Sequence, residues 1–83
     1  MTSTMPIPSQ KKEVTSTVNQ LGNITLGIPI SARIVSVVAK TGNYYFIPFQ
    51  ANENGSWYAR AYDWGTGAII ANGTSINMII WYQ

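Results

Sequence analysis

The alternation of apolar and turn-forming positions along the chain predicts a protein built from β-strands. β-Branched and aromatic residues, which suit a pleated and half-buried surface, gather in short runs. From Arg33 to Gln83 no break between these runs is long enough for a helix. The number of turns indicates about six or seven strands. We place them at Glu13–Leu21, Ile24–Leu26, Ile30–Lys40, Tyr44–Gln50, Ser56–Asp63, Ala68–Ala71 and Thr74–Tyr82.

Turn-forming residues mark where these strands reverse. The pairs Asn54-Gly55 and Asn72-Gly73 tolerate the positive φ that tight hairpin turns require. A glycine-rich turn also follows Asp63. Pro48 removes a hydrogen-bond donor from its strand, which favours an edge strand or a bulge there. The expected fold is therefore all-β, a small antiparallel sandwich or barrel-like domain.

The first twelve residues differ from the rest of the chain. They contain Pro6, Pro8, two lysines and little apolar material. This composition is typical of a flexible or extended lead-in. We therefore expect a lead-in or linker over residues 1–12 and a single all-β domain over residues 13–83.

The composition of the chain predicts self-association. The 83 residues are 46% hydrophobic and 10% charged, whereas soluble domains are usually about 25% charged. The chain has no Cys and no His, so neither a disulfide nor a structural metal site is expected to stabilise so small a core. A closed homo-oligomer that buries the apolar surface between subunits is the simplest arrangement.

The charges of the chain predict neither nucleic-acid binding nor membrane insertion. Five basic and three acidic residues leave a net charge of +2, which is too small and too scattered for a groove that follows phosphates. The apolar runs are much shorter than the roughly 20 residues that cross a bilayer. The polar start of the chain does not resemble a signal peptide.

The inventory of side chains predicts a protein that is not an enzyme and needs no cofactor. Without His and Cys there is no imidazole base, no thiolate and no catalytic triad. A glycosidase requires two carboxylates on either side of one bond. Glu53 and Asp63 both lie in predicted turns, where acidic residues serve conformation or solubility. We assign no catalytic residue.

One strand carries a stripe of amphipathic side chains. Alternation along Ser56–Asp63 places Trp57, Ala59 and Ala61 on one face, which we interpret as interior. The opposite face carries Tyr58, Arg60 and Tyr62. Such a stripe suits a subunit contact, an ordinary surface, or a site that stacks on a sugar ring and hydrogen-bonds its hydroxyls.

Other aromatic residues lie beside turns, where binding groups are common. Tyr44 and Tyr45 follow one turn, and Trp64 lies among glycines in another. A Trp in a glycine-rich turn is harder to explain as core. Trp64, Asp63 and Tyr62 are therefore the first candidates for ligand contacts, and the full candidate set is Tyr44, Tyr45, Tyr58, Arg60, Tyr62, Asp63 and Trp64.

Five segments combine aromatic residues and turns in a recognisable pattern: Val35–Ala39, Gly42–Phe49, Gly55–Arg60, Ala71–Ser75 and Ile80–Tyr82. With this pattern, which contains no catalytic signature, the chain from about Gly27 to Gln83 resembles the C-terminal domains of tail-fibre or baseplate proteins of phages and prophages of Gram-positive hosts.

The resemblance implies a trimeric β head that attaches a virion to a saccharide on the bacterial surface, acting at the tail tip outside the host cell. Related domains supply no set of ligand residues to transfer onto this sequence. A tail fibre also needs a virion-anchoring part that 83 residues do not provide. The chain is thus expected to be a C-terminal fragment, an internally initiated product or a stand-alone relative. A structural trimerisation cap and a wall-binding accessory of a phage lytic enzyme are the alternative functions.

Overall fold

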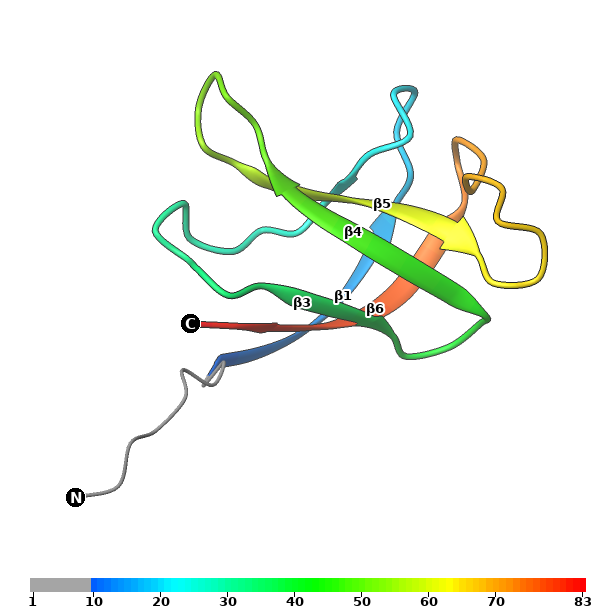
Figure 1. Ribbon diagram of the computed structural model, residues 1–83, viewed down its shortest axis with the longest axis horizontal. Helices are drawn as coiled ribbons and strands as arrows, with labels where there is room; N and C mark the ends of the chain where they lie inside the picture. Colours follow the sequence, from blue (N-terminus) through cyan, green and yellow to red (C-terminus); the bar gives the residue numbers. More distant parts are fainter. Residues whose placement is uncertain (1–9) are drawn as a thin grey trace.

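The computed structural model describes residues 10–83, which form six strands and no helix (Figure 1). Residues 1–9, most of the predicted lead-in, lie outside the described residues. Within residues 10–83 there is no helix long and apolar enough to cross a membrane. The strands are β1 (Gln10–Thr17), β2 (Ile24–Thr25), β3 (Ser36–Ala39), β4 (Tyr44–Gln50), β5 (Trp57–Asp63) and β6 (Ser75–Tyr82).

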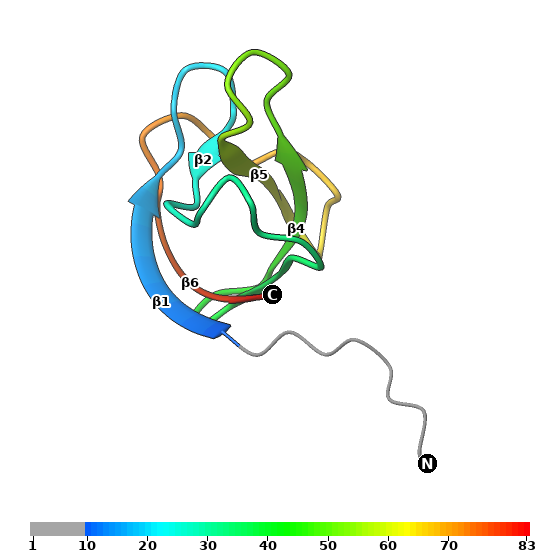
Figure 2. The same cartoon turned by 90° about the vertical axis from the view of Figure 1, so that its left-hand side faces the viewer.

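The six strands form two antiparallel sheets of three strands. Sheet A has the order β1-β6-β3, and sheet B has the order β2-β5-β4. The chain passes from one sheet to the other at four connections, between β1 and β2, β2 and β3, β3 and β4, and β5 and β6. Figure 2 shows the two sheets facing each other across the interior. The expected all-β antiparallel fold is confirmed, with six strands where about six or seven were predicted.

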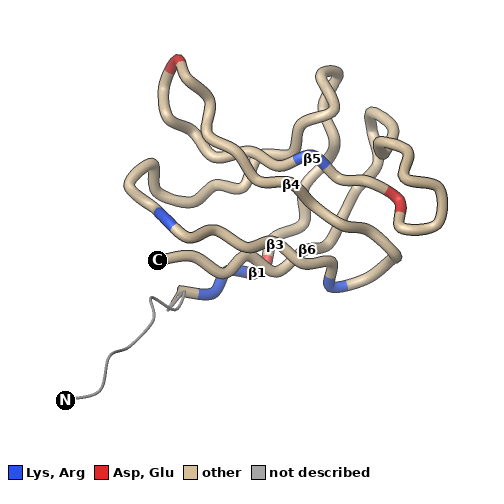
Figure 3. Tube along the Cα trace, in the orientation of Figure 1, with Lys and Arg blue, Asp and Glu red and all other residues tan. Residues whose placement is uncertain are grey.

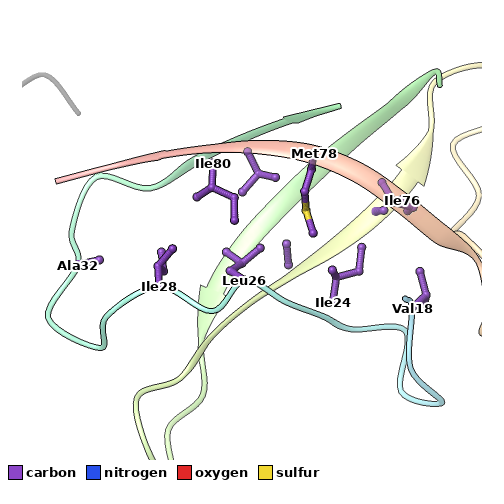
Figure 4. Packing of buried hydrophobic residues seen from close by; sticks show 11 residues of the cluster. Val18, Ile24, Leu26, Ile28, Ala32, Ile76, Met78 and Ile80 are labelled. Carbon is purple, nitrogen blue, oxygen red and sulfur yellow. The ribbon is translucent and has the colours of Figure 1, made fainter. Parts of the chain in front are cut away.

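The core lies between the two sheets (Figure 4). Alternate residues of β6 supply one wall, because Ile76, Met78 and Ile80 are each at most 1% exposed. Ala59 and Ala61 of β5 are equally buried on the facing wall, as the alternation in the sequence predicts. Removing these side chains from water is the main force that holds the sheets together.

The strand expected at Ile30–Lys40 is much shorter than predicted, because only Ser36–Ala39 joins sheet A. Arg33 pairs with Gln83 through two backbone hydrogen bonds of 2.7 and 2.9 Å. Ser36 pairs with Trp81, so the two residues between Arg33 and Ser36 oppose one residue of β6. This β-bulge contains Ile34 at a φ of 54°, a left-handed conformation that is costly for a β-branched residue.

The strand expected at Ala68–Ala71 is reduced to an isolated bridge between Tyr62 and Ile69. Two backbone hydrogen bonds of 2.9 Å accompany the bridge, from the N–H of Asp63 to the oxygen of Ala68 and from the N–H of Ile70 to the oxygen of Ala61. Beyond it the oxygen of Ala71 accepts from the N–H of Thr74 at 3.2 Å, so the chain turns there and does not continue along β5.

The first strand begins earlier and ends earlier than the expected Glu13–Leu21. It includes Gln10 and stops at Thr17. Asn19 accounts for the early end, because its side-chain oxygen Oδ1 accepts hydrogen bonds from the backbone N–H groups of Leu21 and Asn23, each at 2.9 Å. Such local bonds compete with strand pairing and favour a turn.

Candidate functional site

The outer face of sheet B gathers most of the aromatic candidates. The register of β4 and β5 pairs Tyr45 with Tyr62, Ile47 with Arg60, and Phe49 with Tyr58. Because side chains alternate along a strand, all six lie opposite the buried Ala59 and Ala61. We call this surface the aromatic face, and it consists of Tyr45, Ile47, Phe49, Tyr58, Arg60, Tyr62 and the adjoining Trp64.

One end of the aromatic face is a group of three rings in contact, two of them stacked and the third tilted. Tyr45 and Tyr62 have ring centroids 5.2 Å apart and planes inclined by 18°. Trp64 lies 4.7 Å from Tyr45 at a tilt of 51° and is 63% exposed. Ring pairs at these separations stabilise each other. The three rings thus hold one another in a fixed platform, and the Trp64 ring of this platform is open to solvent.

The turn after β5 explains how Trp64 reaches this platform. The Asp63 carboxylate oxygen Oδ1 accepts hydrogen bonds from the N–H groups of Gly65 at 2.7 Å and Thr66 at 3.1 Å. The N–H of Trp64 donates to the backbone oxygen of Asn43 at 3.0 Å. Asp63 therefore shapes the turn that presents Trp64.

The other end of the aromatic face holds a second ring pair and a cation. Phe49 and Tyr58 stack with centroids 5.9 Å apart and planes inclined by 30°. The guanidinium carbon of Arg60 lies 5.8 Å from the centre of the Phe49 ring. Its Nε donates a hydrogen bond of 3.3 Å to Oδ1 of Asn23. The stack and the hydrogen bond together orient the guanidinium plane.

A cleft of about 360 Å³ opens beside this second ring pair. It lies between the loop that follows β1 and the hairpin that joins β4 to β5. Neutral amides are prominent among its polar groups, and amides both donate and accept hydrogen bonds. The lining includes Asn19, Leu21, Asn23, Phe49, Asn52, Glu53 and Tyr58.

A second groove, of about 420 Å³, lies beside the three-ring platform. Tyr45 and Trp64 form one side of it, and Val38 and Asn43 contribute further lining. Tyr44 also lines this groove, but it projects from the opposite face of β4 to Tyr45 and packs against the core. The two neighbouring tyrosines therefore share the groove but project from opposite faces of β4.

The structure brings five of the seven sequence candidates onto one surface, namely Tyr45, Tyr58, Arg60, Tyr62 and Trp64. It also adds Ile47, Phe49 and Asn23, which the sequence analysis did not select. Alternation along Tyr44–Gln50 was the available signal for Phe49, since it shares a face with Tyr45. Asn23 is distant in sequence and is identified only by its contact with Arg60.

The aromatic face offers two kinds of contact group. Its rings offer apolar faces, and the surrounding amides, hydroxyls and guanidinium offer hydrogen bonds. Within residues 10–83 no group of three or more acidic residues is placed to hold a metal ion. Comparisons of the chain with protein-family models, curated proteins and solved structures found no match.

Proposed function

We propose that the chain is a non-enzymatic receptor-binding domain of a phage tail, and that it recognises a carbohydrate on the bacterial surface through its aromatic face. The observation that carries the proposal is the pair of ring groups on the outer face of sheet B, with polar groups beside them. A pyranose presents an apolar side to an aromatic ring and a rim of hydroxyls to hydrogen bonders.

The assignment to a phage tail is supported by the resemblance of Gly27–Gln83 to tail-fibre domains. It implies a virion protein that acts at the tail tip. A homotrimer is part of the proposal, since large apolar side chains outside the core, such as Leu21 and Ile30, are more than half exposed. Each site would bind weakly, and three sites on one fibre would raise the overall avidity.

The test compares wild type with Trp64→Ala for binding to whole bacterial cells and to purified wall polysaccharide. Trp64 is largely exposed, so its removal is expected to preserve folding and assembly while it weakens binding. The matched control is Trp81→Ala, which removes an exposed Trp from the outer face of sheet A and is expected to bind like wild type.

Two outcomes would contradict the proposal. Equal binding by wild type and Trp64→Ala would exclude Trp64 from the site. If wild type bound no preparation across a broad panel of hosts, the structural trimerisation cap would become the better function. Light scattering on the same samples tests the trimer, because a folded species of 9.1 kDa would contradict it.

A further inference from the structure

The five basic residues of the chain differ in what occupies their charged groups. Lys11 and Lys40 both lie within 4 Å of a carboxylate oxygen of Glu13. The Lys12 ammonium donates to the backbone oxygen of Gly27 at 2.7 Å. Arg33 donates from Nη1 to two backbone oxygens. Four of the five cations are thus bound by oxygen acceptors at their charged ends.

Arg60 is the exception within residues 10–83. Only its Nε donates, to the neutral amide oxygen of Asn23, and no carboxylate lies within ion-pairing distance of it in the described residues. Its two terminal nitrogens therefore remain open as donors. A planar guanidinium with both terminal nitrogens available matches a carboxylate or a phosphate through two parallel hydrogen bonds.

The guanidinium of Arg60 lies between the two pairs of aromatic rings. It follows Tyr58 by two residues and precedes Tyr62 by two residues on the same face of β5. The two ring pairs lie four residues apart along β4, at Tyr45 and Phe49. At about 3.3 Å per residue this separation is roughly 13 Å. A ligand that contacts both ring pairs must therefore be longer than one sugar ring.

Figure 3 shows that the basic segment of β5 lies apart from the other charged segments of the trace. No acidic side chain belongs to the aromatic face, and Asp63 directs Oδ1 into its own turn. Arg60 is therefore the one charged side chain of the aromatic face, although Glu53 lines the cleft beside Tyr58. At Arg60 itself the open guanidinium favours an anionic group over another cation.

We infer that the ligand of the aromatic face is an acidic oligosaccharide that spans the two ring pairs and places a carboxylate or a phosphate on Arg60. The inference rests on the proposed function and specifies that the ligand is negatively charged and longer than one sugar ring. The two sources of negative charge share one chemistry at the guanidinium. The sugar rings on either side of the anion stack on Tyr62 with Trp64 and on Phe49 with Tyr58.

The experiment uses wall polysaccharide from a strain whose cells the wild-type protein binds. It is prepared in three forms: untreated, with its carboxyl groups reduced to alcohols, and with its phosphodiesters removed by hydrofluoric acid. Binding is measured by calorimetry for wild type, Arg60→Gln and Arg60→Lys, with Lys40→Gln as the control. Lys40 lies at the end of sheet A and carries the same charge.

We expect wild type to lose about tenfold or more in affinity for one of the two treated forms, which identifies the anion, because charge-assisted hydrogen bonds contribute roughly that much. Arg60→Gln should show the same loss on untreated polysaccharide and no further loss on the treated form. Arg60→Lys should fall between the two, since it retains the charge without the fork. Lys40→Gln should bind like wild type.

The inference is overturned if wild type binds all three forms equally, or if Arg60→Gln binds like wild type. An equal loss for Lys40→Gln would also overturn it, because the effect would then come from net charge alone. In these cases the saccharide-binding function stands. If wild type binds no polysaccharide, the proposed function itself fails, and the inference fails with it. Circular dichroism of Arg60→Gln confirms that the exposed variant is folded.

Discussion

The outer faces of the two sheets differ in how their polar groups are occupied. On sheet A, Thr15 donates to the side-chain oxygen of Asn77 at 2.6 Å, and Lys40 lies 3.3 Å from Glu13. The one large ring of this face, Trp81, is covered by the ammonium of Lys11 at 5.5 Å. The polar groups of sheet A thus largely satisfy one another.

Sheet B presents the opposite situation. Its rings stack on one another, and its central cation, Arg60, has a single amide partner. Stacking holds the ring side chains in one orientation while their outer surfaces remain open. Binding a ligand would therefore cost less side-chain entropy, because these side chains are already ordered. The rings of sheet B are thus ordered by one another while Arg60 keeps donors open to solvent, and this difference from sheet A is what supports the proposed binding.

The largest expected effect is a loss of stability when the inner side of β6 is truncated and not its outer side. Ile80→Ala removes a fully buried side chain beneath sheet A and should lower the free energy of unfolding by about 2–5 kcal/mol. Ile79→Ala, on the outer side of the same strand, should cost clearly less. Urea denaturation measures both. Equal losses would show that the two sides of β6 do not differ in burial.

The second prediction separates the two faces by binding. Tyr62→Ala removes the ring that stacks on Tyr45 and should weaken binding to wall polysaccharide about two- to tenfold, as expected for one aromatic contact. The unfolding midpoint should fall modestly, because Tyr62 is only partly buried but its ring stacks on Tyr45. Trp81→Ala on sheet A should leave affinity unchanged. A greater loss for Trp81→Ala would assign the site to the other face.

A smaller effect is expected at the strained end of sheet A. Ile34→Gly should raise the free energy of unfolding by about 0.5–1 kcal/mol, because glycine adopts the φ of 54° without the penalty of a β-branched residue. Val38→Gly, in the regular part of β3, should instead destabilise. Thermal denaturation of both variants decides the matter, and destabilisation by Ile34→Gly would mean that its side-chain contacts outweigh the strain.

The smallest effect is expected from the ion pairs of sheet A. The side chains of Glu13 and Lys40 are about half exposed, and exposed pairs contribute about 0–1 kcal/mol. Glu13→Gln should therefore lower stability by less than 1 kcal/mol and should not change polysaccharide binding. A loss of binding would show that the sheet A face takes part in recognition.

The amino-acid sequence by itself determined the strand composition of the protein and the direction of many of its side chains. The period of two along Trp57–Asp63 assigns Ala59 and Ala61 to the interior and Tyr58 and Tyr62 to the opposite face, as the structure has them. This information is local, because alternation follows from the pleat of a single strand. The Asn-Gly pairs are local signals of the same kind.

Only the tertiary structure decided which strands pair and which side chains meet. The register of β4 and β5 sets Phe49 against Tyr58 and Tyr45 against Tyr62, and no local pattern encodes it. The strand predicted at Ala68–Ala71 keeps only the bridge between Tyr62 and Ile69, and its extent depends on how that segment lies along β5. Contacts such as Arg60 with Asn23 join residues far apart in the chain, so they depend on how the sheets pack around the core.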